Sequence, residues 1–150
     1  MKFLNLKMIA ILGAIIFIIL DIFIKNFFSL NPEKEIKIFS WFSLRQELNY
    51  GVAFSLPFPR LPLLVLTGFL LTVIVFYFVY CLKNKKIWSG IFSFFILLGG
   101  ANNYFDRMFK GFSRDQFDLN GIIVNLSDVL IFFGVVGLFF IQAEFFKRRN

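Results

Sequence analysis

The sequence contains no histidine and only one cysteine, Cys81. A single cysteine excludes any disulfide within the chain, and without histidine neither a Cys-His dyad nor a zinc site of cysteine and histidine is possible. Cys81 lies within an apolar run, so we interpret it as a small packing residue rather than a nucleophile. Acid-base chemistry, if the chain performs any, is therefore expected from carboxylates.

Charge is also scarce, since only 17% of the 150 residues are charged while 59% are hydrophobic. With a mean hydropathy of +0.78, this composition is typical of an integral membrane protein. The formal net charge of +7 could suggest a nucleic-acid partner. However, the basic residues form short clusters between apolar runs, without interleaved aromatic residues that could stack on bases. Membrane topology accounts for them better, and no nucleic-acid partner is expected.

Four apolar runs are long enough to cross the roughly 30 Å of hydrocarbon in a bilayer. They are residues 8–28, 61–82, 87–105 and 121–146. We therefore expect a mainly α protein, a membrane four-helix bundle that forms one polytopic domain over residues 1–150. The first run lacks the small-residue cleavage site of a secretory signal peptide, so we interpret it as a retained helix.

The basic residues of the short loops predict the orientation of these spans. If four helices alternate, three basic clusters with little accompanying acid fall on one side: Lys2 with Lys7, Lys83 with Lys85 and Lys86, and Lys147 with Arg148 and Arg149. That side is predicted to be cytoplasmic, and both termini lie there. The opposite side receives residues 31–60 and 108–120.

Two aspartates, Asp106 and Asp128, lie at the edges of predicted spans, where a charge costs a few kcal/mol and is often functional. The third span runs outward and the fourth runs inward, so both carboxylates are expected near the outer membrane boundary. Each has an asparagine three residues earlier on its helix face, Asn103 and Asn125 respectively. The alternative, that these polar residues merely hold the helices together, stays open from spacing alone.

The segment between the first two predicted helices is more apolar than a solvated linker. Residues 35–39 alternate polar and apolar side chains, and an aromatic stretch that includes Trp41 continues toward Asn49. Alternation of this kind predicts strands, so we expect a small extracytoplasmic β-sheet here. Trp41 and neighbouring phenylalanines are suited to the membrane interface.

Polar residues recur in four short motifs. In chain order they are Asp21-x-x-x-Lys25, Asn49-x-Gly51-x-Ala53-Phe54-Ser55, Asn103-x-x-Asp106-Arg107 and Asn125-x-x-Asp128. Together, and in this order, they resemble the signature motifs of the lipoprotein signal peptidase (signal peptidase II) family. The resemblance spans most of the chain and agrees with the predicted topology.

The chain departs from this family pattern at a few positions. Asn102 stands where the family usually has glycine, and Ser127 stands where an alanine precedes the second aspartate. A further family element, G-x-x-x-D before the last helix, is matched only by Gly111 and Asp115. Asp115 is therefore expected to be structural or supporting.

The resemblance implies an intramembrane aspartic endopeptidase of the bacterial inner membrane. Such an enzyme removes the signal peptide from diacylglyceryl-modified prolipoproteins by cutting before the lipidated cysteine. Asp106 and Asp128 would be the catalytic pair and would share a proton, without a metal ion or cofactor. The expected partners are the prolipoprotein substrate and membrane lipid, and the chain is expected to act as a monomer.

The resemblance also suggests roles for the other motif residues. Substrate binding or support of the aspartate pair is expected from Asn49, Gly51, Phe54, Asn103, Arg107 and Asn125. Asp21 and Lys25 are spaced i, i+4 in the favourable order, so their expected role is to neutralise each other.

Two other functional classes remain open from the sequence. A small proton-coupled transporter or channel could use Asp21, Asp106 and Asp128 as a relay, and a catalytically silent scaffold would need no chemistry. The clustering of Asp106 and Asp128 toward one membrane face argues against a transporter, as does the lack of a broken-helix repeat.

Overall fold

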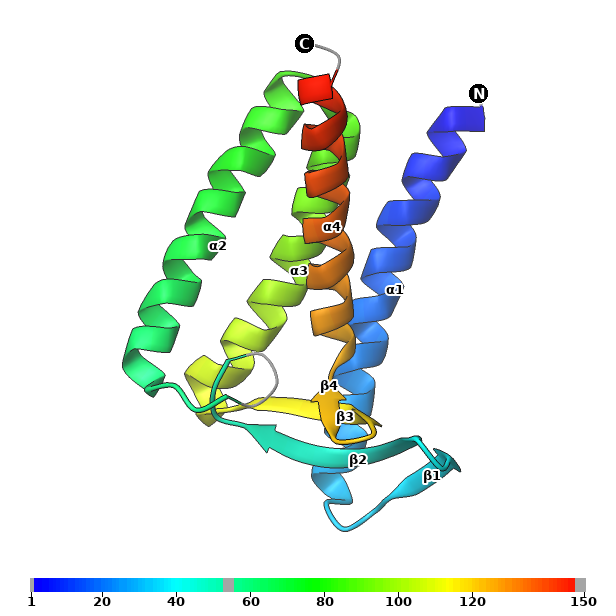
Figure 1. Ribbon diagram of the computed structural model, residues 1–150, viewed down its shortest axis with the longest axis vertical. Helices are drawn as coiled ribbons and strands as arrows, with labels where there is room; N and C mark the ends of the chain where they lie inside the picture. Colours follow the sequence, from blue (N-terminus) through cyan, green and yellow to red (C-terminus); the bar gives the residue numbers. More distant parts are fainter. Residues whose placement is uncertain (1, 53–55, 148–150) are drawn as a thin grey trace.

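The computed structural model describes residues 2–52 and 56–147. Its helices are α1 (Lys2–Leu30), α2 (Arg60–Lys83), α3 (Ile87–Lys110) and α4 (Leu126–Lys147). Its strands are β1 (Ile36–Phe39), β2 (Phe42–Asn49), β3 (Ser113–Leu119) and β4 (Ile122–Val124). The strands gather at one end of the helices, and the opposite end holds the start of α1, the turn between α2 and α3, and the end of α4 (Figure 1). The predicted mainly α fold with a small sheet is confirmed.

Three of the described helices are apolar and long enough to cross a membrane. They are Leu6–Leu30, Arg60–Lys83 and Leu126–Phe145. Large hydrophobic side chains on these helices are widely exposed, as expected for surfaces that face lipid. The predicted apolar runs at the first, second and fourth positions are thus helical.

The α3 helix differs from the other three because it is the central helix, packed against α1, α2 and α4. Its buried residues are mostly small or polar: Ser89, Gly90, Ile91, Ser93, Gly99, Gly100, Asn103 and Asp106. A Cβ added to Gly99 would lie 2.4 Å from the carbonyl oxygen of Ser127, so only glycine allows α3 and α4 to approach this closely. The polar side chains of α3 therefore face protein rather than lipid.

The sheet is larger than the sequence predicted. Its four antiparallel strands are ordered β1-β2-β3-β4. Strands β1 and β2 lie between α1 and α2 as expected, but β3 and β4 come from the segment between α3 and α4. Because residues 122–124 pair with residues 117–119, α4 begins at Leu126 and not at the expected residue 121.

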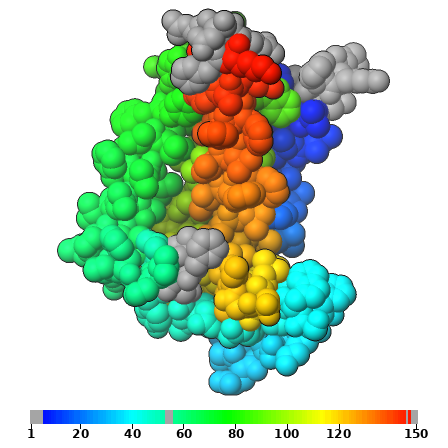
Figure 2. Space-filling model, in the orientation of Figure 1, coloured from blue at the N-terminus to red at the C-terminus, as the bar shows by residue number. Residues whose placement is uncertain are grey.

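The register of the sheet determines which residues reach the helix ends. Strands β2 and β3 pair with Asn49 opposite Ser113 and Glu47 opposite Asp115. Strand β3 begins shortly after α3 ends and also contacts α1, so it carries its first residues over the ends of both helices. Figure 2 shows the strands covering this end of the molecule, with α4 between α1 and α2 on the viewed face.

Candidate active site

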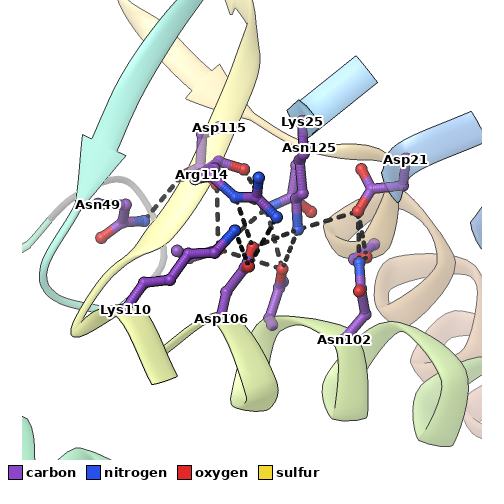
Figure 3. Close-up of polar contacts among 12 residues, drawn as sticks. Asp21, Lys25, Asn49, Asn102, Asp106, Lys110, Arg114, Asp115 and Asn125 are labelled. Atoms are coloured by element: carbon purple, nitrogen blue, oxygen red, sulfur yellow. Dashed lines mark hydrogen bonds and ion pairs between the residues drawn. The ribbon is translucent and has the colours of Figure 1, made fainter. Parts of the chain in front are cut away.

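Asp106 lies near the sheet end of α3, where three cations surround its buried carboxylate. Its oxygens lie 2.9 Å from Arg114 Nη2, 3.2 Å from Lys25 Nζ and 3.4 Å from Lys110 Nζ (Figure 3). Arg114 on β3 also donates to Asn26 Oδ1 and Ser29 Oγ of α1. Asp106 is thus the centre of an ion cluster that joins α1, α3 and β3.

Asp128 lies in the first turn of α4, held by a reciprocal cap. Its backbone N–H donates to Asn125 Oδ1 at 2.9 Å, and its carboxylate accepts from the backbone N–H of Asn125 at 3.2 Å. This is the geometry of a capping box, which satisfies backbone donors that the start of a helix leaves free. The spacing Asn125-x-x-Asp128 therefore fixes the carboxylate at the beginning of α4.

The described contacts connect Asp106 and Asp128 through two other side chains. Lys25 Nζ, which pairs with Asp106, donates to Asn103 Oδ1 at 3.0 Å. The amide nitrogen of Asn103 in turn donates to Asp128 Oδ1 at 2.8 Å. Asn103 thus contacts Asp128 directly and Asp106 only through Lys25.

Asp115 on β3 is the second carboxylate that the structure brings to Asp128. Its side chain is 1% exposed and accepts hydrogen bonds from Asn49 Nδ2, at 2.9 Å, and from Asn125 Nδ2. Asn125 therefore holds Asp115 through its amide nitrogen while its amide oxygen holds the backbone of Asp128. Asp115 and Asp128 are within electrostatic reach of each other.

The environment of Asp115 favours its protonated form. Burial raises the pKa of the Asp115 carboxyl above its ordinary value, although hydrogen bonds from Asn49 and Asn125 and the charges of Lys25 and Arg107 oppose this shift. A buried acid with a raised pKa beside a second carboxylate is suited to acid-base chemistry. The sequence predicted only a supporting role for Asp115, because the partial G-x-x-x-D match was the one sequence feature that pointed to this residue.

The loop after β2 approaches the same carboxylates. Gly51 donates its backbone N–H to Asn49 Oδ1 at 2.9 Å, and its carbonyl accepts from Arg107 Nη2 at 2.9 Å. A Cβ on Gly51 would lie 1.8 Å from the carbonyl oxygen of Leu56, so the position requires glycine. Phe54, the remaining predicted residue of this motif, lies outside the described residues.

Asp21 and Lys25 form an ion pair of 2.9 Å with both side chains fully buried. Their role is wider than mutual neutralisation, since Lys25 also contacts Asp106 and Asn103. Within residues 2–52 and 56–147, no group of three histidine, cysteine, aspartate or glutamate side chains is arranged to hold a metal ion. The site is built from carboxylates, amides and cations.

Comparison with known families decides which group of proteins this site belongs to. The family model described as Signal peptidase (SPase) II matches residues 13–145. The chain belongs to the signal peptidase II family. As a member, it is a peptidase, hence a hydrolase, of the bacterial inner membrane, and the family likeness recognised from its motifs is confirmed.

Curated relatives of this signal peptidase II family member cover nearly its whole length. A lipoprotein signal peptidase of Wigglesworthia glossinidia brevipalpis is 29% identical over 143 residues, which is 85% of this chain and 93% of the relative. One from Francisella tularensis subsp. novicida (strain U112) is 29% identical over 164 residues, covering 100% of this chain and 99% of the relative.

Solved structures agree at the level of the fold. A bacterial membrane enzyme determined by the in meso method at 2.3 Å resolution has a TM-score of 0.77 and 16% identity, covering 94% of this chain and 91% of that chain. A second, determined at 1.9 Å resolution, has a TM-score of 0.69 and 17% identity, covering 89% and 91%. Neither the relatives nor these structures lend support to the transporter alternative.

Proposed function

We propose that this signal peptidase II family member is an aspartic endopeptidase that removes the signal peptide from diacylglyceryl-modified prolipoproteins, cutting before the lipidated cysteine. The observation that carries the aspartic mechanism is the shared amide of Asn125, which holds Asp115 on one side and the backbone of Asp128 on the other. Two neighbouring carboxylates with different surroundings are the usual means by which one side chain acts as acid and another as base.

The choice of the two carboxylates needs an argument, because the sequence favoured Asp106 with Asp128. That pairing stays a prediction. Three cations neutralise Asp106, which makes it an ion-pair partner rather than an acid free to exchange a proton. Among the described residues, Asp115 accepts side-chain hydrogen bonds from uncharged groups, the amides of Asn49 and Asn125 and the hydroxyl of Ser113. We therefore propose Asp115 and Asp128 as the reacting pair, with Asp106 organising the cations around it.

The proposed chemistry is the addition of water to the scissile carbonyl. One carboxylate accepts a proton from water as its oxygen attacks the carbonyl carbon, and the other, protonated, carboxyl donates its proton to the carbonyl oxygen. The tetrahedral adduct then collapses and the C–N bond breaks: the leaving amine takes the proton that the first carboxylate had accepted from water, and a hydroxyl of the adduct returns its proton to the other carboxylate. The two groups share one proton at the start, so they titrate as a coupled pair.

Arg107 is the proposed contact for the substrate backbone. Its Nη2 holds the carbonyl of Gly51, whereas its buried Nε has no hydrogen-bond partner among the described residues. A buried donor without a partner is costly, so a group that fills this position on binding gains affinity. A peptide carbonyl of the substrate is such a group, and Asn49 would keep the adjacent loop in position.

We further propose that the sheet end faces outward and that both termini are cytoplasmic. Lys83, Lys85 and Lys86 gather at the turn between α2 and α3, at the end away from the sheet (Figure 1). Short loops rich in lysine and arginine remain on the cytoplasmic side. In this orientation the carboxylates lie near the outer interface, where both water and a lipid-anchored cysteine are accessible.

Purified protein and synthetic prolipoprotein peptides test this function. We expect the parent to cleave a peptide whose cysteine carries a diacylglyceryl group, with mass spectrometry locating the cut before that cysteine. The same peptide without lipid should react far more slowly, and Asp128→Asn should abolish cleavage while preserving membrane insertion. Absence of cleavage by the parent, together with ion or solute flux in liposomes, would contradict the peptidase proposal.

A further inference from the structure

Three side chains from three helices meet beside the start of α4 and form a closed polar ring, here called the α1-α3-α4 triad: Asp21, Asn102 and Ser127. Asn102 Nδ2 donates to Asp21 Oδ2 at 2.6 Å and to Ser127 Oγ at 2.8 Å. Ser127 Oγ closes the ring by donating to Asp21 Oδ2 at 2.8 Å. Asp21 and Ser127 are fully buried. Figure 3 shows Asn102 pointing from α3 toward Asp21 on α1.

The triad also caps α4. The second carboxylate oxygen of Asp21 accepts from the backbone N–H of Leu126, the first residue of α4, at 2.8 Å. The first N–H groups of a helix have no partner within the helix, and the helix dipole favours a negative charge at this end. A carboxylate from α1 thus supplies a cap that lies far away in the sequence, while Asn125 supplies the local cap.

Capping from two sides constrains the position of Asp128, one of the two proposed reacting carboxylates. Asp128 belongs to the same first turn as Leu126 and Ser127, so a rotation or translation of this turn moves its carboxylate relative to Asp115. The local restraint on this turn, from the residue just before it in the chain, is the cap by Asn125. The triad restrains it from the side of α1 and α3, because Ser127 and Leu126 are both bonded to Asp21.

We infer that Asn102 and Ser127 are positioning residues for the reaction: through Asp21, they hold the first turn of α4 in the orientation that presents Asp128 to its partner carboxylate. This inference rests on the proposed function. Because Asn102 and Ser127 share one hydrogen bond, removing either residue breaks two of the three bonds of the ring, while the bond from Leu126 to Asp21 remains. The two residues are therefore coupled, and their effects on the reaction are not independent.

A double-mutant cycle on the full-length protein tests this coupling. The variants are Asn102→Ala, Ser127→Ala and the double variant, assayed with the lipidated peptide. We expect each single variant to lower kcat about ten-fold, with KM changed by less than about two-fold, since hydrogen bonds to a charged group are among the stronger ones. The double variant should be no slower than about the slower single variant. Ser127→Thr, which retains a hydroxyl, should recover most of the parent kcat.

Ser93→Ala is the matched control, because Ser93 is also a fully buried serine, but among the described residues its hydroxyl donates only to the backbone of its own helix, at Ser89 O. It should leave kcat near the parent value. Multiplicative losses in the double variant, unchanged kcat in both single variants, or no recovery by Ser127→Thr would each overturn the inference. If the parent cleaves no lipidated peptide, the proposed function fails; non-additive shifts in unfolding temperature then support the triad, and additive shifts overturn it.

Discussion

Replacing Lys25 by methionine removes the most fully enclosed cation of the site while keeping an unbranched side chain of similar length. Lys25 is 0% exposed, and its ammonium lies 2.9 Å from Asp21 and 3.2 Å from Asp106. Breaking a buried ion pair by removing one partner costs about 3–5 kcal/mol, because the remaining charge is left uncompensated. Asp21 and Asp106 each keep other hydrogen-bond donors in this variant, so we take the free-energy cost of breaking one ion pair rather than two.

For a chain of this size, about 1 kcal/mol shifts the unfolding temperature by roughly 2–4 °C. We therefore expect Lys25→Met to lower the unfolding temperature by about 10 °C. Unfolding in detergent can be followed with a thiol-reactive dye, because the single cysteine, Cys81, is buried in the folded protein. Adding Asp21→Asn to Lys25→Met should recover part of the loss, since it removes one of the uncompensated charges.

Lys37→Met is the matched control for this measurement. Lys37 is paired with Glu35 at 3.9 Å, but its side chain is 77% exposed. Exposed ion pairs contribute about 0–1 kcal/mol, so this variant should unfold near the parent temperature. The electrostatic reasoning is refuted if Lys25→Met lowers the unfolding temperature no further than Lys37→Met does.

Two further predictions concern the loop after β2 and the buried acid. The methyl group added by Gly51→Ala would lie 1.8 Å from the carbonyl oxygen of Leu56, so peptide cleavage should fall by more than about ten-fold. Gly13→Ala is the control, because a methyl group there has nothing within 4 Å, and it should retain parent activity in the same assay. Because burial raises the pKa of Asp115, its contribution to stability is present at low pH and is lost as the pH rises through that raised pKa. The unfolding temperature of Asp115→Asn relative to the parent should therefore increase with pH, and a difference that does not vary with pH would contradict this.

The helices could be predicted from the sequence because hydrocarbon imposes a simple requirement on it. A segment that spans a bilayer must be long and apolar, and α1, α2 and α4 satisfy this by composition alone. The spacing of Asn125 and Asp128 also carried information about local structure, since an asparagine three residues before an aspartate forms the reciprocal cap at the start of α4.

The contribution of β3 could not be predicted because its burial depends on contacts distant in the sequence. Residues 113–116 are all polar and resemble a solvated loop, yet all four are buried once β3 pairs with β2. Arg114 then reaches Asp106, and Asp115 reaches Asn125. We propose Asp115 as the second reacting carboxylate on the basis of these contacts, which no motif spacing along the chain encodes.

Asn102 and Ser127 likewise form contacts that the sequence alone does not predict. In the sequence they are two separate departures from the family pattern, each a polar residue where a smaller or apolar one is usual. In the structure they contact each other and Asp21. Their relation depends on the close approach of α3 and α4, which Gly99 allows.

The central claim is that Asp128 reacts together with Asp115, and the cleavage rates of three aspartate variants test it most directly. Each rate is measured with lipidated peptide and normalised to the folded fraction of the protein. The account predicts that Asp115→Asn and Asp128→Asn fold but lose cleavage by at least about a thousand-fold, whereas folded Asp106→Asn retains measurable cleavage. Retained cleavage in Asp115→Asn, with complete loss in folded Asp106→Asn, would contradict the account.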